Sequence, residues 1–116
     1  MSSQEFRNEL EALGYEVQEP MAQSVTFEYT VPLGKNKGKK ILIGFEKLNS
    51  YPMNCPHGPH FKTVGVKDWI NPTQATHESN FGPEWIHWSR PFNEWNKGER
   101  TVKRYLAHIR NVLAKL

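Results

Sequence analysis

The chain has 116 residues, of which 23% are charged and 12% are aromatic, and its net charge at pH 7 is +3. This length fits a single domain over residues 1–116 with one core, and the aromatic content excludes a disordered chain. A single cysteine excludes an intrachain disulfide and a zinc site made of several cysteines, and no apolar run is long enough to cross a bilayer.

The first predicted element is a helix over residues 3–14. Ser2 and Glu5 have the spacing of a capping box, in which each side chain satisfies a free backbone N–H group of the first turn. Gly14 suits the left-handed position that follows the last turn of a helix. The apolar residues that recur at helical spacing on one face are Phe6, Leu10 and Leu13.

Two strands joined by a turn are predicted next. Apolar and polar side chains alternate over residues 24–31 and again over residues 40–48, as expected for half-buried strands of an antiparallel sheet. Proline and glycine mark the turn between them. The lysines around this turn form either a solvated hairpin tip or a docking patch for an acidic partner. They are Lys35, Lys37, Lys39 and Lys40.

The middle of the chain is less regular than its ends. Three prolines keep residues 49–59 out of a ladder strand or a helix interior. Residues 60–66 and 85–89 predict a third and a fourth short strand, separated by an irregular stretch at residues 69–83. Residues 99–116 form an amphipathic helix by their apolar spacing. This order predicts an α+β fold: an N-terminal helix, a four-stranded antiparallel meander and a C-terminal helix.

The distribution of charge bears on partners. Six of the twelve acidic residues lie in residues 1–28, so the rest of the chain carries the positive charge. This excess is modest and loosely spread, so neither nucleic acid nor a membrane is an expected partner. No secretory signal is visible at the N-terminus, and a cytoplasmic location is therefore expected.

Candidate chemistry gathers around the one cysteine, Cys55, with His57, His60, His77 and His87 in the same part of the chain. The spacing from Cys55 to His60 matches no standard zinc motif, so no metal site is predicted and these imidazoles are expected to be structural or exposed. Cys55 is either a small apolar filler or a nucleophile whose pKa a nearby imidazolium lowers. No glycine-rich phosphate loop or nucleophile elbow is present, and no cofactor is expected.

Several short motifs resemble those of the UBC fold of E2 ubiquitin-conjugating enzymes. Residues 51–56, Tyr-Pro-Met-Asn-Cys-Pro, resemble the Tyr-Pro-Phe-x-Pro-Pro signature after the third strand. Residues 88–91, Trp-Ser-Arg-Pro, resemble the Trp-Ser-Pro that opens the helix behind the active site. Residues 77–80, His-Glu-Ser-Asn, occupy roughly the place of the His-Pro-Asn motif or the stretch after it. The histidine-rich residues 56–61 and the Gly-Pro-Glu-Trp of residues 82–85 are similar to bacterial E2-like proteins of the prokaryotic E2 family E type.

The resemblance covers nearly the whole chain and implies a UBC-like fold in which a long irregular crossing carries the active site. It implies a ubiquitin-like protein, an E1-like activating enzyme and a JAB-type peptidase as partners. The family's cysteine is expected near residues 76–80, where this chain has none. Either the protein binds without transferring, or Cys55 has taken over as thioester carrier, with His60 or His77 as base or oxyanion donor.

The function expected from this resemblance is an E2-like component of a bacterial ubiquitin-like conjugation system. The proline-rich stretch and the aromatic stretch before the last helix are expected to form one shallow groove. The residues expected to bind a partner there are His57, His87, Trp88 and Arg90. The alternatives are a non-catalytic UBC/RWD-like interaction module and, less favoured, a histidine-rich metal-binding domain.

Overall fold

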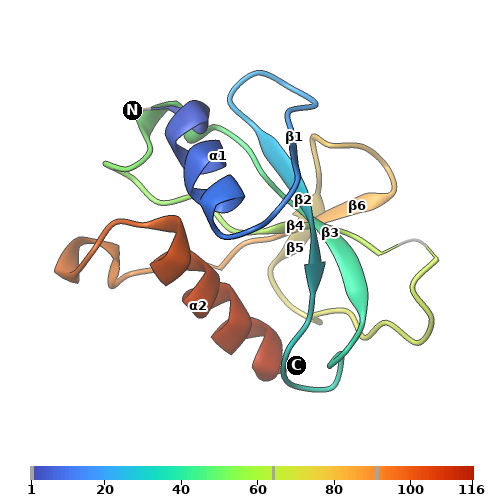
Figure 1. Ribbon diagram of the computed structural model, residues 1–116. Coiled ribbons are helices and arrows are strands. Elements are labelled where there is room, and N and C mark those ends of the chain that lie inside the picture. Colours follow the sequence, from blue (N-terminus) through green and yellow to red (C-terminus); the bar gives the residue numbers. More distant parts are fainter. Residues whose placement is uncertain (1, 64, 91) are drawn as a thin grey trace.

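Two helices pack on one face of a six-stranded antiparallel sheet in the computed structural model, which describes residues 2–63, 65–90 and 92–116 (Figure 1). The helices are α1, Ser3–Ala12, and α2, Val102–Ala114. The order across the sheet is β1-β2-β3-β4-β6-β5. The strands are β1 Val17–Gln18, β2 Val25–Thr30, β3 Lys40–Phe45, β4 His60–Lys62, β5 Thr76–Glu78 and β6 Trp85–Trp88.

The α+β class is confirmed, but the prediction of a four-stranded meander is wrong. Strands β1 to β4 are consecutive neighbours, and β6 then lies between β4 and β5. After β4 the chain therefore forms the edge strand β5 and then returns to form β6 between β4 and β5. The predicted irregular stretch, residues 69–83, contains β5. The long irregular segment therefore connects β4 to β6 by way of β5, instead of following the last strand. Strand β5 was missed because its three side chains are all exposed and show no apolar alternation.

The core lies between the helices and one face of the sheet. Phe45 on β3 is 5.4 Å from the ring of Phe6 on α1 and 5.3 Å from that of Tyr105 on α2, measured between ring centroids. The register places Phe27, Ile43 and Phe61 in line on this face. Aromatic rings in tilted and edge-on contact thus join both helices to the central strands.

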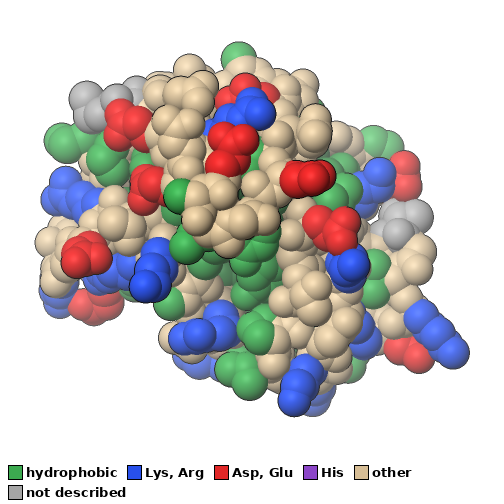
Figure 2. Space-filling view, viewed as in Figure 1, with side chains coloured by type: hydrophobic (Ala, Val, Ile, Leu, Met, Phe, Trp, Pro, Cys, Tyr) green, Lys and Arg blue, Asp and Glu red, His purple; other side chains and the backbone are tan. Residues whose placement is uncertain are grey.

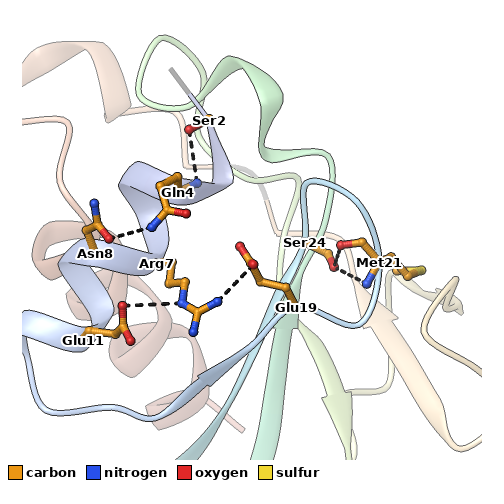
Figure 3. A network of polar contacts seen from close by, with 8 residues as sticks. All are labelled: Ser2, Gln4, Arg7, Asn8, Glu11, Glu19, Met21 and Ser24. Atoms are coloured by element: carbon orange, nitrogen blue, oxygen red, sulfur yellow. Dashed lines mark hydrogen bonds and ion pairs between the residues drawn. The ribbon is translucent and has the colours of Figure 1, made fainter.

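Helix α1 begins as predicted and ends two residues earlier. Ser2 is its N-cap, and the Ser2 hydroxyl accepts a hydrogen bond from the Gln4 N–H at 3.1 Å (Figure 3). Phe6 and Leu10 of the predicted apolar face are buried, whereas Leu13 lies at the C-cap, beyond the last helical residue, and is 45% exposed. Arg7 pairs with Glu11 and Glu19, which ties the helix to the segment after β1 (Figure 3).

The turn between β2 and β3 is anchored rather than free. Gly34 has a φ of +89°, and a Cβ there would lie 2.9 Å from the Cα of Ala114, so the turn packs closely on the end of α2. Buried Asn36 bonds both the N–H and the carbonyl of Ile70, each at 2.8 Å. Lys39 donates to the Asn36 side chain and to the Asp68 carbonyl. The other three lysines of the turn are exposed, as a solvated tip requires.

Candidate functional site

The proline-rich segment, residues 49–59, lies against the aromatic segment, residues 85–95. The Trp95 indole N–H donates to the Pro52 carbonyl at 3.1 Å, and the Trp88 backbone N–H donates to the Pro59 carbonyl at 2.9 Å. Gly58 allows this approach, because a Cβ there would lie 2.3 Å from the Trp88 carbonyl oxygen. The two segments therefore lie side by side, as the sequence predicts.

Two open pockets of about 540 and 340 Å³ follow the contact between these segments. Both are lined by Lys47, His57 and Ser89, so they form one continuous hollow, which we call the groove. Cys55 lies in the first pocket and His60 in the second. Polar side chains that line the first pocket are Ser50, Asn54, Asn93 and Asn96. Those that line the second include Glu46, Glu78, Asn80 and His87.

Three histidines form a row across neighbouring strands. His60 on β4 is paired with His87 on β6, and His87 is paired with His77 on β5. Cross-strand partners share a face of the sheet, and this face is opposite the one that carries Ile43 and Phe61, because successive side chains alternate. Consistent with this, the view over the two helices shows no His side chain among the described residues (Figure 2).

His60 is the most buried member of the row, with 3% of its surface exposed. Its ring stacks on His87 with centroids 4.2 Å apart and planes inclined by 5°, and Phe81 meets it edge-on at 5.0 Å. Its Nδ1 atom lies 2.7 Å from the Ser79 hydroxyl oxygen. Burial, with the nearby His87 and Lys47 charges, lowers the pKa of His60 to about 3, so the ring is neutral at pH 7.

His87 is half-buried, and burial lowers its pKa, opposed by a hydrogen bond to the His57 backbone. Its Nε2 atom is buried and has no hydrogen-bond partner within the described part of the chain. Over residues 2–63, 65–90 and 92–116, no three His, Cys, Asp or Glu side chains are placed to hold a metal ion. His77 is exposed, with its ring 5.9 Å from that of His87, and it does not line either pocket of the groove.

Cys55 is half-buried at the wall of the groove. Burial raises the pKa of its thiol, and hydrogen bonding with the Phe92 backbone only partly offsets this effect. A nucleophilic cysteine instead needs a lowered pKa, because the thiolate is the reactive form. The raised pKa therefore does not favour the hypothesis that Cys55 carries a thioester, and that hypothesis stays a prediction.

The residues expected to bind a partner are only partly brought together. His57 is exposed in the groove and His87 lines it. Trp88 is 5% exposed in the core, and Arg90 lies over the Trp88 ring with its Cζ 5.4 Å from the centroid. Trp88 and Arg90 line a different pocket, beside Lys115 at the end of α2, so they belong to another part of the surface.

Some residues of the site were not found from the sequence. Ser79 contacts His60, and the Asn80 side chain donates to Glu46 at 2.9 Å across the second pocket. Ser89 lies at the centre of the groove. Serine and asparagine are common in turns and loops, so these residue types alone do not indicate a site. Only the resemblance of residues 77–80 in place to the His-Pro-Asn motif, or to the stretch after it, singles out this part of the chain.

Comparison of the chain with known protein families gives no match, and neither do comparisons with curated proteins and with solved structures. Within the described residues, neither helix has the length and apolar character needed to cross a membrane.

Proposed function

We propose that the protein is an E2-like component of a bacterial ubiquitin-like conjugation system, in which the groove holds the extended C-terminal tail of a ubiquitin-like protein. The observation that carries the proposal is the close packing of residues 49–59 on residues 85–95 into one open, continuous groove. These are the two stretches whose motifs resemble the UBC fold.

The lining of the groove suits a polypeptide in extended form. Such a segment presents unpaired backbone N–H and C=O groups, and each of these needs a hydrogen-bond partner when it leaves water. The serine and asparagine side chains of the first pocket both donate and accept. Lys47 and His57 lie where the two pockets meet and offer a cationic and a polar partner to a terminal carboxylate.

An E1-like activating enzyme and a JAB-type peptidase are the further partners of this proposal. Acidic side chains gather over α1, whereas Lys and Arg predominate over α2 (Figure 2). An enzyme that docks on α1 would therefore present a basic surface, since like charges across an interface oppose binding.

Binding of the tail is tested by calorimetric titration with ubiquitin-like proteins from the same genome. The expected result is measurable binding that disappears when the last residues of the tail are deleted, and that Ser89→Trp weakens by filling the groove. Lys62→Ala, which changes a side chain outside both groove pockets, is the control variant. Binding that survives deletion of the tail would instead favour a general UBC/RWD-like interaction module.

The sequence also raised thioester transfer through Cys55, which lies in the same groove as His57, as an alternative. Incubation with an E1-like enzyme, ATP and the ubiquitin-like protein would then give a thiol-sensitive adduct that Cys55→Ala abolishes. Because burial raises the pKa of the thiol, we expect no such adduct.

A further inference from the structure

Ser79 and His60 form a hydroxyl–imidazole pair next to the groove. The Ser79 Oγ atom lies 2.7 Å from His60 Nδ1 and accepts a hydrogen bond from the Phe81 backbone N–H at 3.1 Å. No other acceptor for the Ser79 hydroxyl hydrogen occurs among the residues described. In the tautomer that carries the His60 ring hydrogen on Nε2, the Ser79 hydroxyl donates to His60 Nδ1.

The imidazole of His60 is held in place from two sides. His87 stacks on it at 4.2 Å, and Phe81 meets it edge-on at 5.0 Å. Phe81 in turn sits over Gly44, where a Cβ would lie 2.9 Å from its ring atoms. Packing thus restricts the rotation of the His60 ring, and in the tautomer with the hydrogen on Nε2 the neutral ring directs the lone pair of Nδ1 at the hydroxyl.

The hydroxyl side of the pair is open to a ligand. Ser79 is half-buried and lines an open pocket of about 440 Å³ together with Glu78, Gly82, Pro83 and Trp85. This pocket and the groove share Glu78. A carbonyl group in the pocket can reach Ser79, while His60, which is 3% exposed, lies behind it and lines the groove.

We propose that Ser79 is an acyl acceptor, activated by His60, for esters and thioesters of carboxylic acids. The Ser79 oxygen attacks the carbonyl carbon and forms a C–O bond, and its proton passes to His60 Nδ1. The bond from the carbonyl carbon to the leaving oxygen or sulfur then breaks, and the leaving group takes the proton from His60. The products are an ester on Ser79 and a free alcohol or thiol.

The acyl group of the tail of a ubiquitin-like protein is one substrate of this class, and that assignment rests on the proposed function. The chemistry itself does not, because a small ester reaches the pocket without binding to the groove. A small ester therefore tests Ser79 independently of tail binding.

The probe is 4-nitrophenyl acetate, mixed with the whole chain under single-turnover conditions. The expected result is release of one equivalent of 4-nitrophenolate, with an acetyl group located on Ser79 by peptide mass spectrometry. Ser79→Ala abolishes both signals, whereas Thr76→Ala, which changes an exposed hydroxyl on β5 outside this pocket, keeps them. Absence of acetyl on Ser79 in the unchanged chain overturns the proposal.

The part played by His60 is tested by His60→Gln, which we expect to slow acetylation by about tenfold or more, less than the roughly 10²- to 10⁴-fold of a general base with a pKa near 7, because its low pKa makes His60 a weaker base. An unchanged rate in a folded His60→Gln variant overturns that part. If this variant does not fold, the pH profile of the unchanged chain decides. Activation by His60 predicts a nearly constant rate from pH 5 to 8, whereas unassisted attack by the ionised hydroxyl predicts a rate that rises tenfold per pH unit.

Discussion

At the scale of single residues, Glu9 joins three parts of the molecule. One oxygen of its carboxylate accepts a hydrogen bond from the Tyr51 hydroxyl at 2.6 Å, and the other accepts from the Val102 N–H at 3.1 Å. The side chain of Tyr51 is 1% exposed, and burial together with this bond raises its pKa. A carboxylate on α1 thus caps the first turn of α2 and fixes Tyr51 within the proline-rich segment.

Glu9→Ala is expected to lower the free energy of unfolding by about 1–3 kcal/mol, because it leaves a helix N–H without an acceptor and leaves the buried Tyr51 hydroxyl only the Arg100 carbonyl at 3.4 Å. Glu11→Ala on the same helix removes only a solvent-exposed ion pair and is expected to change stability by less than about 0.5 kcal/mol. Urea denaturation measures both. Equal effects of the two variants would show that the Glu9 contacts do not stabilise the fold.

The buried histidines make stability depend on pH. Burial lowers the pKa of His60, His87 and His108 below the ordinary value of 6.5, to about 3 for His60. Between pH 6.5 and about 3 the unfolded chain therefore binds more protons than the folded chain, and stability is lost as the pH falls through this window. Titration of the unfolding free energy is expected to show a loss of up to about 1.4 kcal/mol per pH unit from His60.

His60→Gln removes that contribution and is expected to flatten the fall in stability between pH 6 and 4. The comparison is of slopes, so a lower overall stability of this variant does not affect it. A variant that loses stability as steeply as the unchanged chain would mean that His60 takes up its proton without disturbing the fold.

At the scale of elements, the sequence predicts those with a long periodic pattern. The predicted strand at residues 24–31 is observed as Val25–Thr30, and the predicted helix at residues 99–116 is observed as Val102–Ala114. Each packs one side on the core, and this packing produces the regular spacing of apolar residues on which the prediction was based. Strands β1 and β5 have two and three residues, too few for any period. The insertion of β6 between β4 and β5 depends on long-range pairing, which no local pattern encodes.

The same limits explain which site residues could be predicted. The prolines and aromatic residues mark the two segments of the groove, since their effects on backbone and packing are local. The row of His60, His87 and His77 follows only from the strand order, which was not predictable. Trp88 was wrongly placed beside His87 in the groove, although neighbouring residues of a strand point to opposite faces of its sheet.

The contact between the two groove segments is tested by Gly58→Ala. Gly58 has a φ of +129°, and a Cβ would lie 2.3 Å from the Trp88 carbonyl oxygen, so the substitution strains the backbone and also pushes the segments apart. Gly14→Ala is the matched control, because Gly14 has a φ of +99° but nothing within 4 Å of the added Cβ. Thermal unfolding is expected to show that Gly58→Ala lowers the free energy of unfolding by about 2 kcal/mol or more beyond the effect of Gly14→Ala. Equal losses would mean that the segments separate without cost.

At the scale of the whole molecule, the two faces of the sheet carry different groups of residues. One face supports the core through both helices, and the other carries the histidine row, the Ser79–His60 pair and part of the groove. Because core packing and the histidine row use different faces, side-chain changes in the second pocket of the groove are expected to affect binding with little effect on the core.

The central claim is that the groove receives the tail of a ubiquitin-like protein, and the most direct measurement is a nuclear magnetic resonance titration of the isotope-labelled chain. The account predicts that amide signals of residues 47, 57 and 89 shift on addition of the intact ubiquitin-like protein and stay in place when its tail has been removed. Shifts confined to the helix face, or shifts that persist without the tail, would contradict it.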